Sequence, residues 1–192
     1  MPEQLSFGGF DEAKTRDSLF FALLPDADSA SRITALERYI SGKHGLTGKP
    51  LADRLHISLY SLGVYAGLPR GIVATAREAA ATVAAAPFDV AFDRVKSVDV
   101  GPRSQALVLG GGGFHTALVA FWQALGVAMA KAGLGRWVHK RFSPHLTLLY
   151  DERIVDEEAV KAIGWTVREF VLVDSLQGQS RYIPLGRWPL RG

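Results

Sequence analysis

The 192-residue chain contains no cysteine, which excludes several kinds of site. Without thiols it can form no disulfide, use no thiolate nucleophile and bind no zinc through cysteine. This composition suits a reducing compartment, and we expect a cytoplasmic protein. The first residues lack the basic start and apolar middle of a signal peptide. We expect residues 1–17 to be a flexible leader and residues 18–192 to form a single domain.

The sequence also lacks an apolar run long enough to predict a membrane span. The longest run, residues 114–130, is interrupted by His115 and Gln123, so it predicts a buried helix, and we expect no membrane partner. Hydrophobic residues make up 48% of the chain and charged residues 21%, as in ordinary globular proteins. We also expect the protein to be a monomer. The net charge of +3 is compatible with an anionic substrate.

Apolar periodicity and turn residues divide the chain into strands and helices. Strands are predicted at residues 18–24, 55–62, 88–95, 105–109, 144–150, 168–176 and 181–185. Helices are predicted at residues 28–41, 69–86, 114–133 and 156–163. Because hairpin-like strand pairs interrupt the alternation of strand and helix, the order favours an α+β fold over a doubly wound sheet.

Two short segments carry the same polar pattern on an otherwise apolar strand. The sequences HISL, which begins at His56, and HLTL, which begins at His145, lie 89 residues apart. Since side chains alternate faces along a strand, His56 and Ser58 share one face, as do His145 and Thr147. Each motif follows a predicted strand and helix, so the repeat predicts two similar lobes.

These motifs suit chemistry on a phosphate group. Residues two apart on a strand lie roughly 7 Å apart, a span that one phosphate can bridge by accepting hydrogen bonds from both side chains. Histidine has an ordinary pKa of about 6.5, so two imidazoles can act as acid and base at neutral pH. A histidine on a half-buried strand can also be a core residue bonded to a carbonyl group. The presence of two matched motifs favours a shared site.

The motifs and their surroundings resemble the two-histidine phosphoesterase superfamily, and within it the LigT-like group of RNA 2′,3′-cyclic phosphodiesterases and 2′-5′ RNA ligases. The resemblance rests on HISL, HLTL, the opening SLFFALLPD, the context RFSPHLTL and the closing FVLVDSLQGQSRYIPLGRWPL. It covers residues 18–190. It implies a bilobal α+β fold with pseudo-two-fold symmetry, in which two antiparallel sheets face a central cleft and the helices lie outside.

The resemblance also implies roles for individual residues. His56 and His145 would be the catalytic pair, and Ser58 and Thr147 would bind the phosphate oxygens of the substrate. Arg141 is a further phosphate-binding candidate, because relatives often have a basic residue there. The family uses neither a metal nor a cofactor, and we expect none in this protein.

The sequence departs from the family pattern after each motif. Many relatives have an arginine there, whereas this chain has Tyr60 and Tyr150. Both tyrosines are candidate substrate contacts, able to hydrogen-bond a phosphate or to stack on a base. Strict alternation points Tyr150 to the core side of its strand, where it would pack instead.

We therefore expect a metal-independent phosphodiesterase that hydrolyses RNA 2′,3′-cyclic phosphate ends to 2′-phosphates, with reversible 2′-5′ RNA ligase activity as a second expected activity. Its expected partner is RNA or an oligonucleotide with such an end. Two alternatives stay open. The same site could act on 2′-5′ oligonucleotides or on small cyclic nucleotide phosphates, or the protein could bind RNA ends without catalysis. The matched pair of histidines favours an enzyme.

Overall fold

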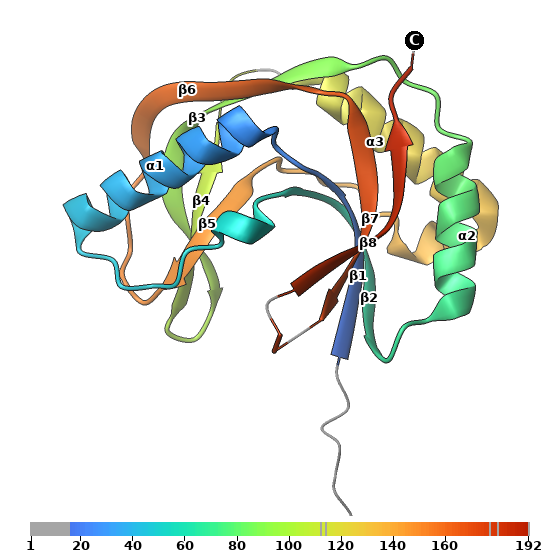
Figure 1. The fold of residues 1–192 in the computed structure, drawn as a ribbon, viewed down its shortest axis with the longest axis horizontal. Coiled ribbons are helices and arrows are strands. Elements are labelled where there is room, and N and C mark those ends of the chain that lie inside the picture. Colours follow the sequence, from blue (N-terminus) through green and yellow to red (C-terminus); the bar gives the residue numbers. More distant parts are fainter. Residues whose placement is uncertain (1–15, 112, 114, 177, 180, 192) are drawn as a thin grey trace, which may run out of the picture.

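The computed structural model describes residues 16–111, 113, 115–176, 178–179 and 181–191. It contains a single antiparallel sheet with the strand order β6-β3-β4-β5-β2-β1-β7-β8 (Figure 1). The strands are β1 (Arg16–Leu23), β2 (Ile57–Ala66), β3 (Phe88–Gly101), β4 (Ser104–Gly110), β5 (Leu146–Asp151), β6 (Glu158–Val167), β7 (Glu169–Leu176) and β8 (Arg181–Pro189). The α-helices are α1 (Ala27–His44), α2 (Arg70–Ala81) and α3 (Thr116–Met129). The α+β class predicted from the sequence is confirmed.

The expectation of two separate sheets is wrong. The halves β6-β3-β4-β5 and β2-β1-β7-β8 meet where β2 lies beside β5, and the register between these two strands contains one described pair, Ile57 and Leu146. This one pair joins two strands that would otherwise be sheet edges, and so links the two halves into one sheet. The repeat in the sequence corresponds to two four-stranded halves of that sheet.

Residues 1–15 of the expected leader lie outside the described residues. Its last two residues, Arg16 and Asp17, already belong to β1. They pair with Ala66 and Tyr65 of β2, so backbone pairing extends the strand beyond the predicted start at residue 18.

Local sequence signals fix the ends of α1 close to where they were predicted. The carboxylate of Asp26 accepts a hydrogen bond from the backbone N–H of Ser29 at 2.8 Å, which caps the first turn. The helix ends at Gly45, whose φ of 64° lies in the left-handed region that glycine adopts without a steric penalty.

The helices cover one face of the sheet and leave the other face open. Leu19, Phe21 and Leu23 alternate toward the helices and are buried with Ile33 of α1 in the main core. In Figure 1, α1 crosses the sheet and contacts β6 and β5, while α2 and α3 lie against each other. Because alternation sends every second side chain of β1 to the uncovered face, a polar site can form there over a rigid core.

The helical segment Thr116–Trp137, which begins with α3, is long and apolar enough to cross a membrane by length and composition. Its inner side is nevertheless part of the core, because Leu118, Phe121 and Leu125 are buried. This burial explains its apolar composition and agrees with the prediction of a buried helix.

Of residues 156–163, predicted as a helix, residues 158–163 belong to strand β6 and residues 156 and 157 are irregular, so that prediction is wrong. β6 pairs with β3 from Val167 opposite Phe88 to Glu158 opposite Val95. Its residues Ile163, Trp165 and Val167 alternate inward and are buried. Pairing along a whole strand and burial of β-branched and aromatic side chains outweigh the weak helical preference of the acidic residues before them.

Candidate active site

Both motifs open onto one cavity on the face of the sheet opposite the helices. The cavity has a volume of about 780 Å³, and its lining includes His56, Ser58, His145 and Thr147. Each histidine directly precedes one member of the residue pair that joins the two halves of the sheet. That pairing therefore brings together the two motifs, which lie 89 residues apart in the sequence.

His56 is held by a carbonyl group and two aromatic rings. Its Nδ1 lies 2.7 Å from the carbonyl oxygen of Arg54, and because a carbonyl only accepts, Nδ1 carries the proton. Its Nε2 lies 3.0 Å from Oγ of Ser58. The rings of Phe20 and Tyr182 pack against the imidazole at centroid distances of 5.0 and 5.4 Å. In the neutral ring, Nε2 is thus the proton acceptor.

His145 repeats the first of these contacts but not its enclosure. Its Nδ1 donates to the carbonyl oxygen of Ser143 at 2.8 Å, again to the residue two positions earlier. The His145 side chain is exposed, whereas that of His56 is half-buried. The two imidazoles share one tautomer and differ in their access to solvent.

The enclosure of His56 changes its titration. Burial lowers the pKa of His56 below the ordinary value, because removing water disfavours the charged ring. The hydrogen bond to the carbonyl of Arg54 raises the pKa, while the positive charges of His145 and Arg54 lower it. At neutral pH His56 is therefore an uncharged imidazole, the form that can take a proton from water.

A β-bulge at the last residue of each motif reverses the alternation of side chains. In β2, Ser58 and Tyr60 pair with consecutive residues of β1, so Leu59 is the extra residue. In β5, Thr147 and Leu149 pair with consecutive residues of β4, so Leu148 is the extra residue. The two bulges lie 89 residues apart, like the motifs. An extra residue turns every later side chain to the opposite face.

The bulge explains why Tyr60 is not a substrate contact, as the sequence had suggested. Tyr60 is 1% exposed, and its hydroxyl donates to the carbonyl oxygen of Trp122 at 3.0 Å. Its ring stacks on that of Trp122 with centroids 5.3 Å apart. Burial raises the pKa of Tyr60 to about 12. Ser61, the next residue, lines the cavity instead.

The second bulge has the opposite effect on Tyr150. Strict alternation predicted that this side chain points to the core, but it is 49% exposed and lines the cavity. Tyr150 is therefore available to a ligand, whereas Leu149 before it is fully buried.

Arg141 does not line the cavity. It is an exposed loop residue whose carbonyl oxygen accepts a hydrogen bond from Nδ1 of His139 at 2.8 Å. The chain reaches the cavity two residues later, at Ser143 and Pro144. The expected arginine contact to phosphate thus has no support from the placement of Arg141.

Other basic residues, which the sequence analysis missed, line the cavity instead. They are Arg54, Arg94 and Lys96, together with the aromatic Tyr182. Lys96 Nζ lies 2.9 Å from a carboxylate oxygen of Glu157, which also lines the cavity. Arg94 and Lys96 are two residues apart on β3, so their side chains share one face of the strand. The sequence alone does not show that this face lines the cavity.

The glycine run after β4 has a local role at Gly111. Its φ is 74°, and a Cβ at this position would lie 2.4 Å from Cγ of Arg94. Glycine thus allows the backbone to pass against the Arg94 side chain at the edge of the cavity.

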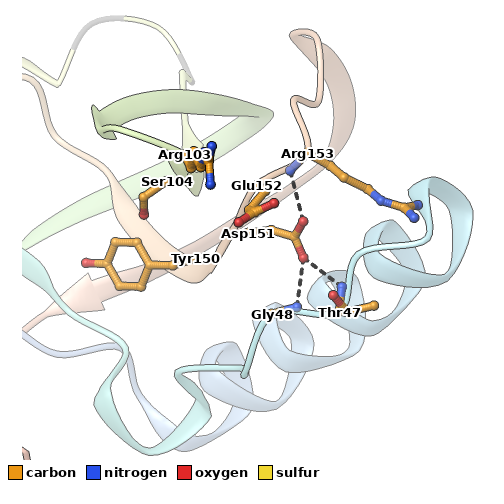
Figure 2. Close-up of a pocket in the computed structure, with 8 residues that line it drawn as sticks. All are labelled: Thr47, Gly48, Arg103, Ser104, Tyr150, Asp151, Glu152 and Arg153. Atoms are coloured by element: carbon orange, nitrogen blue, oxygen red, sulfur yellow. Dashed lines mark hydrogen bonds between the residues drawn. The ribbon is translucent and has the colours of Figure 1, made fainter.

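A second cavity of about 560 Å³ adjoins the first at Tyr150, which lines both (Figure 2). The carboxylate of Asp151 accepts hydrogen bonds from the backbone N–H groups of Thr47, Gly48 and Arg153 at 2.7, 2.8 and 2.9 Å. These bonds, led by that from Arg153, lower the pKa of Asp151. Asp151 thereby ties the loop after α1 to the end of β5.

Within the described ranges, no group of three or more His, Asp or Glu side chains is arranged to hold a metal ion. The polar groups that line the cavity include imidazoles, hydroxyl groups and basic side chains.

Comparisons with known proteins support a common family and fold. The model of the 2′-5′ RNA ligase superfamily matches residues 24–179. None of the curated proteins matches the chain in sequence. A crystal structure described as a phosphoesterase is 25% identical, with a TM-score of 0.69 over 92% of this chain and 99% of that chain.

Crystal structures of E. coli LigT are similar to the same extent. The apo form is 26% identical, with a TM-score of 0.68 over 93% of this chain and 99% of that chain. The complex with 3′-AMP is 26% identical, with a TM-score of 0.69 over 92% of this chain and 99% of that chain. The likeness thus spans both halves of the sheet.

Proposed function

This chain belongs to the 2′-5′ RNA ligase superfamily, and we propose that it is a phosphodiesterase that hydrolyses RNA 2′,3′-cyclic phosphate ends to 2′-phosphates. The observation that carries the proposal is the pair of imidazoles at one cavity, each with Nδ1 bound to a carbonyl and Nε2 left for proton transfer. That E. coli LigT was crystallised with 3′-AMP and with phosphate supports a nucleotide phosphate as the ligand class.

The reaction needs one proton acceptor and one proton donor. His56, neutral because of its lowered pKa, takes a proton from water as the water oxygen bonds to phosphorus. His145, in its protonated form, donates a proton to the 3′ oxygen as the bond between phosphorus and that oxygen breaks. The products are a 2′-phosphate and a free 3′-hydroxyl group. Each histidine ends in the protonation state in which the other began, and exchange with solvent restores them.

The remaining cavity side chains stabilise the charge that builds up on the phosphate oxygens. Thr147 donates a hydrogen bond to one non-bridging oxygen, and Ser58 donates to the other once Nε2 of His56 is protonated. Lys96 lies in the same row of the sheet as Thr147, two strands away, and adds positive charge. Donors on rigid strands are already oriented, so little reorganisation is needed as the charge develops.

The same site can join a 2′,3′-cyclic phosphate end to a hydroxyl group of a second RNA, which then takes the place of the attacking water. His56 takes the proton from the attacking hydroxyl, and His145 protonates the departing 3′ oxygen, which leaves a 2′-5′ linkage; cleavage of that linkage back to the cyclic end uses the two histidines in the opposite roles. The name of the superfamily supports this ligase activity.

The test is incubation of the purified protein with an oligonucleotide that ends in a 2′,3′-cyclic phosphate, with a chelator present, followed by phosphorus NMR. The expected result is conversion of the cyclic signal to that of a 2′-phosphate monoester. A protein that binds the oligonucleotide but leaves the cyclic end intact would be a noncatalytic RNA-end binder, and a 3′-phosphate product would contradict the proposed leaving group.

A further inference from the structure

The lining of the first cavity changes character along β3. Alternation places Arg94, Lys96, Val98 and Val100 on the cavity side of this strand. Arg94 pairs with Gly110, and a Cβ at Gly110 would lie 3.7 Å from the Cβ of His145, so the basic end of the row lies beside that histidine. Val98 and Val100 are 41% and 52% exposed. An apolar surface therefore begins where the positive charge ends.

This apolar surface continues across β4 to β5. Val98 pairs with Ala106, and Ala106 pairs with Tyr150, so the three form one row across the sheet, which we call the apolar shelf. The neighbouring row toward the histidines ends at Lys96 and Thr147 and lies about 7 Å away. A phosphate at Thr147 would thus leave its attached nucleoside over the shelf.

The second cavity places a cation beyond the shelf. Arg103 and Tyr150 both line it (Figure 2). Arg103 has a φ of 57° and is the one non-glycine residue with positive φ in the described part of the chain. Its neighbour in the cavity, Arg153, donates to the carbonyl oxygen of His44 at 3.2 Å. No hydrogen bond or ion pair to the Arg103 guanidinium occurs within the described ranges, and Glu152 lines the same cavity (Figure 2).

We propose that the apolar shelf and Arg103 form a subsite for the RNA chain that precedes the reactive end. This inference rests on the proposed function and specifies where the RNA upstream of the reactive end binds. The terminal base stacks on Tyr150 over Val98, and a phosphate upstream of that nucleoside meets Arg103. Aliphatic and aromatic side chains read the face of a base rather than its edge, so the subsite favours chain length over base identity.

The test compares the binding of two probes by titration calorimetry: a trinucleotide and a mononucleotide, each ending in a 2′-phosphate. The trinucleotide is expected to bind about tenfold more tightly, since both probes place a terminal base on the shelf but only the trinucleotide adds a phosphate contact to Arg103. In Arg103→Gly this advantage is lost while mononucleotide binding is unchanged, and the slope of log affinity against log salt for the trinucleotide falls by about 0.7. Arg77→Ala, which removes one exposed charge on α2, is the matched control and keeps the advantage.

Arg103→Gly is not expected to unfold the protein, so a loss of binding in this variant can be assigned to the missing side chain. Glycine suits the left-handed backbone at this position, so the variant is expected to have a higher Tm than the wild type. Equal affinity for the two probes, an unchanged advantage in Arg103→Gly, or its loss in Arg77→Ala would overturn the subsite. These outcomes are independent of turnover, so a failure to hydrolyse the cyclic end would count against the proposed function alone.

Discussion

Ile57 and Leu146 form the register pair that joins the two halves of the sheet, and each directly follows a histidine of the candidate site. Both side chains are fully buried on the face opposite the cavity. The pair therefore fixes the position of His56 relative to His145 from the core side. We therefore expect stability and activity to be linked through this contact.

Leu146→Ala is expected to lower the free energy of unfolding by about 2–5 kcal/mol, because it removes fully buried methyl groups at the seam and leaves a cavity. Urea denaturation followed by circular dichroism measures the loss. Leu190→Ala, a nearly buried leucine in the same core but far along the chain from either motif, is the control for burial alone. If the seam positions the histidines, Leu146→Ala lowers kcat under conditions where both variants are folded, whereas Leu190→Ala does not.

His56→Ala and His145→Ala are each expected to lower kcat by about 10²-fold or more on an oligonucleotide with a 2′,3′-cyclic phosphate end, in line with general acid or base contributions. His139→Ala is the control, since His139 is exposed and does not line the cavity. Steady-state assays measure the effect. Near-normal kcat in either motif variant would remove that histidine from the mechanism.

The lowered pKa of His56 predicts how this ring titrates and how the stability of the folded protein changes at acidic pH. By proton NMR, the His56 ring is expected to titrate below the ordinary value of 6.5. The unfolded chain protonates this residue near pH 6.5 and the folded chain only at lower pH, so the folded state loses stability as pH falls between the two values. A midpoint above 6.5 in the free protein would contradict the enclosure by Phe20 and Tyr182 as the dominant influence.

The assignment of His145 as the proton donor can be tested with a modified substrate. Replacing the 3′ bridging oxygen of the cyclic phosphate by sulfur gives a leaving group that needs no proton, so general acid catalysis loses its benefit. His145→Ala is expected to recover most of its activity on this substrate, whereas His56→Ala stays slow because water must still be deprotonated. Recovery in His56→Ala alone would reverse the two roles.

The two tyrosines after the motifs are expected to respond in opposite ways. Tyr60→Phe removes a buried hydrogen bond to the carbonyl of Trp122, so it lowers the free energy of unfolding by about 1 kcal/mol and leaves kcat/KM unchanged. Tyr150→Ala leaves stability nearly unchanged, because the side chain is half exposed, and lowers kcat/KM on RNA substrates. Thermal denaturation and steady-state kinetics on the same preparations separate these effects, and a kinetic defect in Tyr60→Phe would contradict the burial of that side chain.

Much of the fold could be predicted because its signals are local. Local periodicity is present in the alternating strands, in the capped helix α1 and in the apolar segment of α3. The two motifs can be recognised as a pair because they share one residue pattern. The helix predicted at residues 156–163 failed for the converse reason. Strand β6 is stabilised by its register with β3, a partner about 70 residues earlier, and no local pattern encodes that partner.

The sequence by itself determined which side chains could carry the chemistry: His56 with Ser58, and His145 with Thr147, on one face of two strands. Only the tertiary structure decided that the strands join in one sheet through Ile57 and Leu146, that Tyr60 is buried while Tyr150 is exposed, and that Arg94 and Lys96 replace Arg141 at the cavity. The physical reason is that alternation predicts a face only while the register is unbroken. A bulge depends on the partner strand, which the sequence of one strand does not contain.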